Sequence, residues 1–202
     1  AAVRETQLRL LEEKGGSGLG QELKRVVPSA TAIAPEQRLP LAEVAVTALK
    51  GLSPNQYRTF CDNTLAMIQA DKSVDLFEYT LQRIIVRHLE PVFSGTSRPA
   101  MRYFDAKSAM PYCVKLLSCL AYWGQDDVAS AEKAFANGAA RLTGGETLKI
   151  LPSDSCGLQM LDEAVDALVV SSPAIKKSAL DAAITCVAAD GRVTVEEAEI
   201  LR

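Results

Sequence analysis

The chain has 202 residues, of which 48% are hydrophobic and 23% are charged. This length suits one domain or two small ones and is sufficient to bury a hydrophobic core. The 22 basic and 25 acidic side chains give a net charge of −3, which lacks the basic field of a nucleic-acid-binding or anionic-membrane-binding protein. The single histidine, His88, excludes an HExxH protease site and any metal centre that needs several imidazoles.

The five cysteines are odd in number and contain no CxxC pair. This pattern predicts small buried side chains in a reducing, cytoplasmic setting rather than a disulfide framework. No apolar run is long enough and free enough of charge to predict a transmembrane helix. The chain lacks an initiator Met and a signal-peptide pattern, and it ends within a helical pattern. We therefore expect a fragment of a longer protein.

Helical periodicity dominates the chain, and no stretch of alternating apolar and polar residues competes with it. We expect an all-α protein with helices near 3–13, 36–51, 54–70, 75–90, 100–123, 126–141, 158–170, 173–189 and 194–202. The glycine-rich segment 14–20 is expected to be a flexible linker. An apolar stripe with the spacing of an amphipathic helix runs along the second expected helix to the residue after it. The apolar face of such a helix normally meets the core. The stripe consists of Leu41, Val44, Ala45, Ala48, Leu49 and Leu52.

An internal repeat relates residues 41–83 to residues 160–202 by an offset of 119, without a gap. Of the 43 aligned pairs, 12 are identical, where residue usage alone would give roughly three or four. Both copies begin one helix with Ser-Pro, at Ser53 and Ser172, which provides a capping hydroxyl before a proline in the first helical position. The sequences Asp75-Leu-Phe-Glu78 and Thr194-Val-Glu-Glu197 each fit a capping box.

The repeat predicts a helical bundle built from two pseudo-symmetric three-helix units. The first covers about 41–90, and the second covers about 158–202 and is truncated by the end of the chain. A different helical section, about 98–141, lies between them. We expect residues 1–35 to form a helical linker from an upstream domain and residues 36–202 to form one domain.

Two pairs of carboxylates occupy the acidic turns of the repeat and are candidate metal ligands: Asp71 with Glu78, and Asp190 with Glu197. Carboxylates at this spacing could hold a divalent cation or accept hydrogen bonds from a polar partner. Turn and cap preferences explain the same residues, so both interpretations stay open. A second set, near the acidic turn and along the following helix, is a candidate partner-binding surface: Asp75, Arg83, Arg87 and His88.

Several segments carry a resemblance to known families. Residues 38–50 and 52–57, Ala70-Asp-Lys-Ser-Val-Asp-Leu-Phe-Glu-Tyr79 and Arg87-His-Leu89 resemble the C-terminal cytoplasmic region of bacterial membrane-anchored zinc metallopeptidases related to HtpX and CAAX-prenyl proteases. Ala189-Asp-Gly-Arg-Val-Thr-Val-Glu-Glu-Ala198 is similar to the signature of TerB-like (tellurite-resistance) helical domains. The first copy departs from that signature at Lys72, where the signature has glycine.

The resemblance implies a TerB-like, non-catalytic accessory or regulatory domain at the cytoplasmic face of the membrane. The chain has no HExxH, so no catalytic residue carries over, and zinc is expected only in a peptidase domain outside this fragment. The expected partner is that upstream domain or another protein, without nucleic acid or direct membrane insertion. Two alternatives stay open: a purely structural or homo-oligomerisation module, and a free-standing stress-response domain that binds metal.

Overall fold

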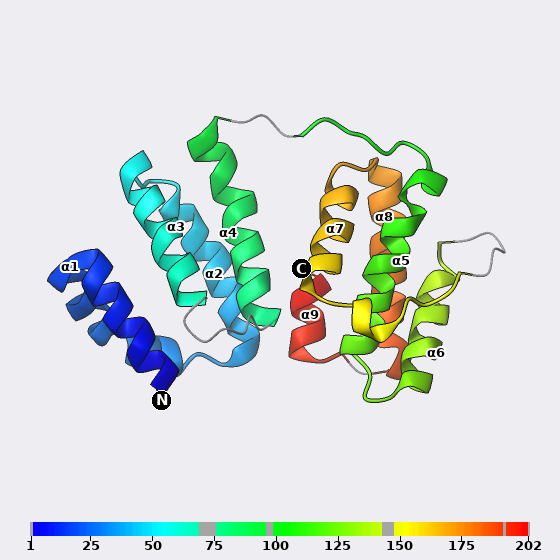
Figure 1. The fold of residues 1–202 in the computed structure, drawn as a ribbon, viewed down its shortest axis with the longest axis horizontal. Coiled ribbons are helices and arrows are strands. Elements are labelled where there is room, and N and C mark those ends of the chain that lie inside the picture. Colours follow the sequence, from blue (N-terminus) through cyan, green and yellow to red (C-terminus); the bar gives the residue numbers. More distant parts are fainter. Residues whose placement is uncertain (1, 69–75, 96–98, 143–147, 192, 202) are drawn as a thin grey trace. The chain divides into compact units, whose positions relative to one another are not determined.

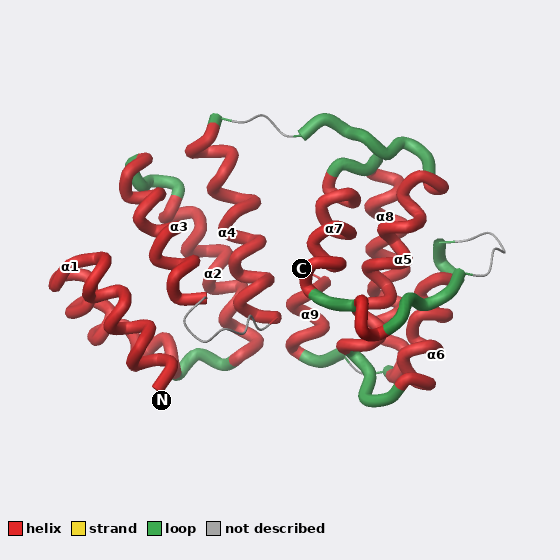
Figure 2. The backbone as a smooth tube through the Cα atoms, in the orientation of Figure 1, coloured by secondary structure: helices red, strands yellow, loops and turns green. Residues whose placement is uncertain are grey.

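The computed structural model describes residues 2–68, 76–95, 99–142, 148–191 and 193–201. In this part of the chain the regular structure consists of nine α-helices and two short 3-10 helices (Figures 1 and 2). The prediction of an all-α protein is confirmed. Among the same residues, no helix combines the length and apolar character needed to cross a bilayer.

The chain divides into two compact units, Ala1–Ser97 and Arg98–Arg202. This boundary lies inside the segment 36–202 that the sequence predicts as one domain. Residues 1–35, which the sequence predicts as a linker, belong to the first unit. The predicted intervening section, 98–141, belongs with the second repeat.

The first unit contains α1 (Ala2–Thr31), α2 (Pro35–Leu49), α3 (Pro54–Ile68) and α4 (Leu76–Ser94). Helix α1 packs against α3, and α2 packs against α4. Its core cluster contains Val46 of α2 and Ile85 and Leu89 of α4. The rings of Tyr57 and Phe93 stack beside this cluster, with centroids 4.1 Å apart.

The expected linker at 14–20 is wrong, because helical structure continues through this segment. The helix is nevertheless sharply bent. Lys24 Nζ lies 2.7 Å from Glu12 Oε1, whereas residues twelve apart in a straight α-helix are about 18 Å apart along the axis. The chain therefore doubles back between these two residues, where the glycine-rich segment lies. Gln7 Nε2 ties the first arm to α3 by donating a hydrogen bond to the Met67 carbonyl at 3.2 Å.

Helix α2 carries apolar residues on two faces, and the expected stripe faces largely outward. Leu39 and Val46 are the buried residues of this helix. Leu49 packs partly against the core, but Leu41 is 49% exposed and Val44 is 70% exposed. The expectation that this face meets the core is therefore wrong for four residues, which we call the α2 stripe: Leu41, Val44, Ala45 and Ala48.

The second unit contains α5 (Ala106–Trp123), α6 (Val128–Ala139), α7 (Leu158–Val169), α8 (Pro173–Val187) and α9 (Val195–Leu201), with 3-10 helices η2 (Ser153–Ser155) and η3 (Ala188–Asp190). Helix α5 packs against α6, α7 and α8, and α6 packs against α8. Gly138 lies where α6 and α8 approach each other, since a Cβ there would come within 2.8 Å of the Ala182 carbonyl oxygen.

The helix boundaries keep the 119-residue offset. Helices α3 and α8 begin at Pro54 and Pro173, and α4 and α9 begin at Leu76 and Val195. The packing differs, however, because α2 packs against α4, whereas its counterpart α7 packs against α5 and α8. Pseudo-symmetry of the two repeats therefore stays a prediction.

Candidate functional site

The acidic turn of the second repeat forms the predicted capping box. Glu197 Oε2 accepts hydrogen bonds from the Thr194 backbone N–H at 2.8 Å and from Thr194 Oγ1 at 3.0 Å. In return, the Glu197 backbone N–H donates to Thr194 Oγ1 at 3.2 Å. These bonds satisfy groups that the helix itself leaves unpaired at its first turn.

The carboxylate of Glu197 is also packed against the end of α5. Glu197 is only 5% exposed, and a Cβ added at Gly124 would lie 2.2 Å from its Oε1. Its negative charge contributes, after burial, to raising the pKa of the Cys186 thiol to about 12. The glutamate thus occupies a fixed position between α5, α8 and α9.

The other candidate metal ligands are placed as follows. Glu78 lies in the first turn of α4 and is half-buried, and Asp190 is exposed at the end of η3. Gly191 follows in the left-handed conformation, with φ of 79°, as its glycine predicts. Asp71 lies outside the described residues. Within the described part of the chain, no group of three or more His, Cys, Asp and Glu side chains is placed to hold a metal ion, so the cation site stays a prediction.

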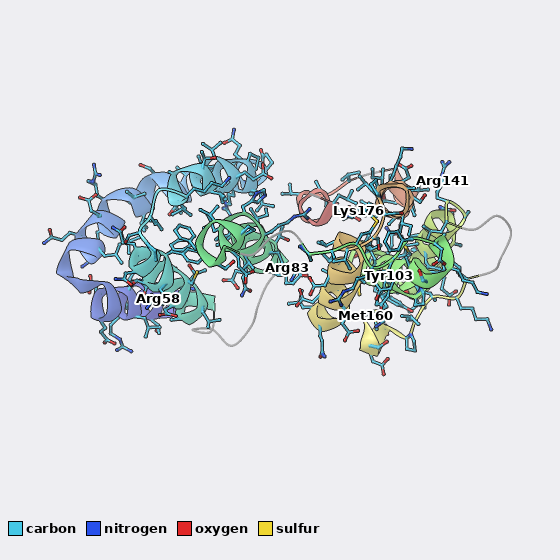
Figure 3. The ribbon with its side chains drawn as sticks, turned by 90° about the horizontal axis from the view of Figure 1, so that it is seen from above. Arg58, Arg83, Tyr103, Arg141, Met160 and Lys176 are labelled. Atoms are coloured by element: carbon cyan, nitrogen blue, oxygen red, sulfur yellow. The ribbon has the colours of Figure 1, made fainter. Side chains whose placement is uncertain are left out.

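The candidate partner-binding residues of the first unit lie along α4. Arg83, labelled in Figure 3, is half-buried, and Arg87 and His88 are exposed. Arg83 and Arg87 are one turn apart and share a face of the helix. Asp75 lies outside the described residues, so its part in this surface is not described.

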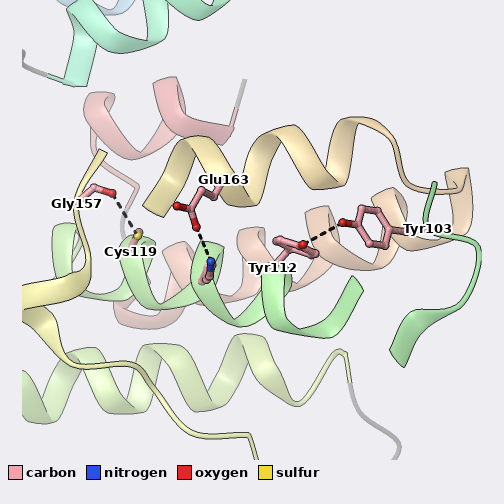
Figure 4. Close-up of polar contacts among 6 residues, drawn as sticks. Tyr103, Tyr112, Cys119, Gly157 and Glu163 are labelled. Carbon is pink, nitrogen blue, oxygen red and sulfur yellow. Dashed lines mark hydrogen bonds and ion pairs between the residues drawn. The ribbon is translucent and has the colours of Figure 1, made fainter. Parts of the chain in front are cut away.

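A row of polar side chains on α5 escaped the sequence analysis. Tyr103 donates a hydrogen bond from its hydroxyl to the Tyr112 hydroxyl at 2.9 Å (Figure 4). One turn along, Lys115 Nζ lies 5.7 Å from the centre of the Tyr112 ring and 2.5 Å from Glu163 Oε2 of α7. The pKa of Tyr103 is raised, mainly by this hydrogen bond with Tyr112. These contacts join α5 to two other parts of the chain: α7, through Glu163, and the segment before α5, through Tyr103.

The segment from 148 to 157 is fastened to the same helix at two adjacent residues. The Leu151 N–H donates to Ser118 Oγ at 3.1 Å, and the Cys119 thiol donates to the Gly157 carbonyl at 4.0 Å (Figure 4). Burial is the main cause that raises the pKa of Cys119 to about 12, and it also raises the pKa of Cys156. Cys156 is also one of the lesser causes that raise the pKa of the Cys119 thiol.

The prediction of small buried cysteines is confirmed for four of the five: Cys113, Cys119, Cys156 and Cys186. Their raised thiol pKa values make them poor nucleophiles at neutral pH. Spacing alone gave no sign of the Cys119–Cys156 neighbourhood, because the two residues lie far apart in sequence.

In comparisons with known proteins, no family model, curated protein or solved structure matches this chain. The resemblance to TerB-like domains and to HtpX-related peptidases therefore stays an expectation from the quoted residues.

Proposed function

We propose that this chain is a non-catalytic helical domain that binds a partner protein through the α2 stripe. The resemblance extends this proposal to an accessory or regulatory domain of a membrane-anchored zinc metallopeptidase at the cytoplasmic face of the membrane. In that setting, any catalytic zinc belongs to the peptidase domain. The buried thiols support a non-catalytic role, since they are poorly suited to form a nucleophilic thiolate.

The observation that carries the proposal is the exposure of the α2 stripe. Leu41 and Val44 are large apolar side chains that are 49% and 70% exposed. Ala45 and Ala48 lie on the same side of the helix, one turn apart or less. Single exposed apolar residues are ordinary on a protein surface, but a continuous apolar stripe is typical of an interaction surface.

The second repeat indicates what kind of partner fits this stripe. Ala45 and Ala48 align with Ala164 and Ala167 of α7, which are buried. Helix α7 packs against α5, so in that unit an apolar helix covers the corresponding face. Small residues allow two helix backbones to approach closely. The partner is therefore expected to present an amphipathic helix with an apolar face like that of α5.

A peptide with the sequence of residues 106–123 provides a defined probe, because this segment is the helix that packs against α7. The peptide carries serine in place of Cys113 and Cys119 and a fluorophore at its N-terminus. Fluorescence anisotropy with the full chain should show saturable binding. Leu41→Asp should weaken this binding at least about tenfold, because a carboxylate would have to leave water at the interface.

The matched control is Val128→Asp on α6, where Val128 is 60% exposed. It introduces the same charge on another helix and should leave the affinity unchanged. Because both positions are exposed, both variants should melt close to the wild type. Failure of the peptide to bind, or an equal loss in both variants, would contradict the proposal. A wild-type dimer that Leu41→Asp dissociates, measured by sedimentation, would favour the oligomerisation alternative.

A further inference from the structure

We propose that Cys119 and Cys156 form a reversible disulfide when the protein meets an oxidising small-molecule disulfide such as glutathione disulfide. The product would fasten the segment 148–157 covalently to α5. This modification site is independent of the partner-binding surface on α2.

The fold brings the two thiols together from distant parts of the sequence. Cys119 lies on α5 and is fully buried, and Cys156 follows η2 and is 8% exposed. The Cys119 thiol points to the carbonyl of Gly157, the residue next to Cys156 (Figure 4), so the fold places Cys156 beside Cys119.

The surrounding contacts hold this arrangement in place. The Cys156 thiol donates to the Pro152 carbonyl at 3.4 Å, which folds the turn back upon itself. The Leu151 N–H donates to Ser118 Oγ at 3.1 Å, next to Cys119 on α5. Both ends of this turn are therefore fastened to neighbouring residues of one helix, which keeps Cys156 beside Cys119.

The more exposed thiol reacts first. The Cys156 thiolate attacks one sulfur of glutathione disulfide, the S–S bond of that molecule breaks, and the first glutathione leaves as a thiolate. The Cys119 thiolate then attacks Cys156 Sγ and displaces the second glutathione. The protein loses two electrons and two protons, and one glutathione disulfide becomes two glutathione thiols. Burial raises the pKa of both cysteines, so the exchange is slow at neutral pH.

The disulfide would close a loop of about 38 residues, counted from the sequence. Closing such a loop restricts the unfolded chain and stabilises the folded state. For a unit of this size the expected rise in melting temperature is several degrees and up to about 15 °C. A reductant such as dithiothreitol should reverse it.

The test incubates the full chain with glutathione disulfide, blocks the remaining thiols and maps the peptides by mass spectrometry. We expect a Cys119–Cys156 linkage together with the higher melting temperature. Cys119→Ala and Cys119→Ser should leave a glutathione adduct on Cys156 and abolish the gain in melting temperature. Cys61→Ser, which changes a half-buried cysteine elsewhere, should keep both the linkage and the gain.

Three results would overturn the proposal. The wild type could stop at the mixed disulfide on Cys156, the linkage could join other cysteines, or no thiol could react over prolonged exposure. Two substitutions at Cys119 guard against a result that reflects misfolding. The adduct on Cys156 in a variant that still melts cooperatively shows that the turn is intact.

Discussion

Replacing Glu197 by alanine removes the carboxylate that closes the capping box at the start of α9. The lost bonds are those from the Thr194 N–H at 2.8 Å and from Thr194 Oγ1 at 3.0 Å to Glu197 Oε2. Both bonds share one oxygen, and Thr194 is exposed to water, so their contributions do not simply add. We expect Glu197→Ala to lower the free energy of unfolding by about 1–2 kcal/mol.

The stability cost of Gly124→Ala tests whether the Glu197 carboxylate is held in one place. In the wild type, Gly124→Ala would put its Cβ 2.2 Å from Glu197 Oε1, and forcing the two groups apart should cost about 1–3 kcal/mol. In the Glu197→Ala background, the closest remaining contact is the Leu120 carbonyl oxygen at 3.2 Å. There the substitution should cost less than about 0.5 kcal/mol. The two changes together should therefore be less damaging than the sum of each alone.

The assay is urea unfolding of the wild type, the two single variants and the double variant. A coupling of about 1–2 kcal/mol is expected, with the double variant more stable than additivity allows. Glu163→Ala combined with Gly124→Ala is the matched control and should show additive effects, because Glu163 instead pairs with Lys115. Additive costs for the Glu197 pair would refute the reasoning, since the carboxylate would then be free to leave Gly124.

Three further predictions concern the second unit. Gly138→Ala should destabilise by about 1–3 kcal/mol in urea unfolding, because α6 and α8 must separate. Gly18→Ala in the first unit is the control and should change stability by less than about 0.5 kcal/mol, because a Cβ there meets open space. Equal effects would contradict the close contact. Hydrogen bonds from Ser130 hold the pKa of Asp127 below its usual value, so its stabilising effect is present above the unfolded-state pKa of about 4 and is lost as the pH falls through the folded-state value. Asp127→Asn should flatten the melting temperature between about pH 5 and pH 2, and an unchanged pH profile would argue against this cap. The cation hypothesis predicts that Ca²⁺ or Mg²⁺ raises the melting temperature and that Asp190→Asn with Glu197→Gln abolishes the rise; no rise in the wild type would exclude it.

Features that depend on neighbouring residues could be predicted from the sequence. The Ser172 hydroxyl accepts from the Ile175 N–H at 3.5 Å, at the helix start that the Ser-Pro pair predicts. The capping box of Thr194 and Glu197 is likewise a contact between residues three apart. Such contacts need only the local backbone, so the residue types and their spacing are sufficient to predict them.

The orientation of α2 could not be predicted, because this helix has apolar residues on two sides. Val46 faces the core and Val44 faces solvent, although both are valine and so equally suited to a core. The choice depends on how α4 packs against the helix, which is a tertiary property. The repeat did not help to predict which face of α2 is exposed, because Ala45 aligns with Ala164 of the other unit, which is buried.

Contacts between residues that lie far apart in the sequence also could not be predicted from it. Lys115 meets Glu163 across 48 positions, and Cys119 meets Gly157, the residue next to Cys156, across 38 positions. The bend in α1 is a related case. The glycines weaken the helix locally, but the helix continues through them, and the contact between Glu12 and Lys24 shows that it turns back.

A methyl NMR titration of the full chain with the 106–123 peptide tests the partner-binding account most directly. The account predicts shifts at the methyl groups of Leu41 and Val44, which are exposed on α2, and little change at the buried Leu39 or at Val128 on α6. Saturating peptide that leaves Leu41 and Val44 unmoved, or that shifts only methyl groups of the second unit, would contradict it.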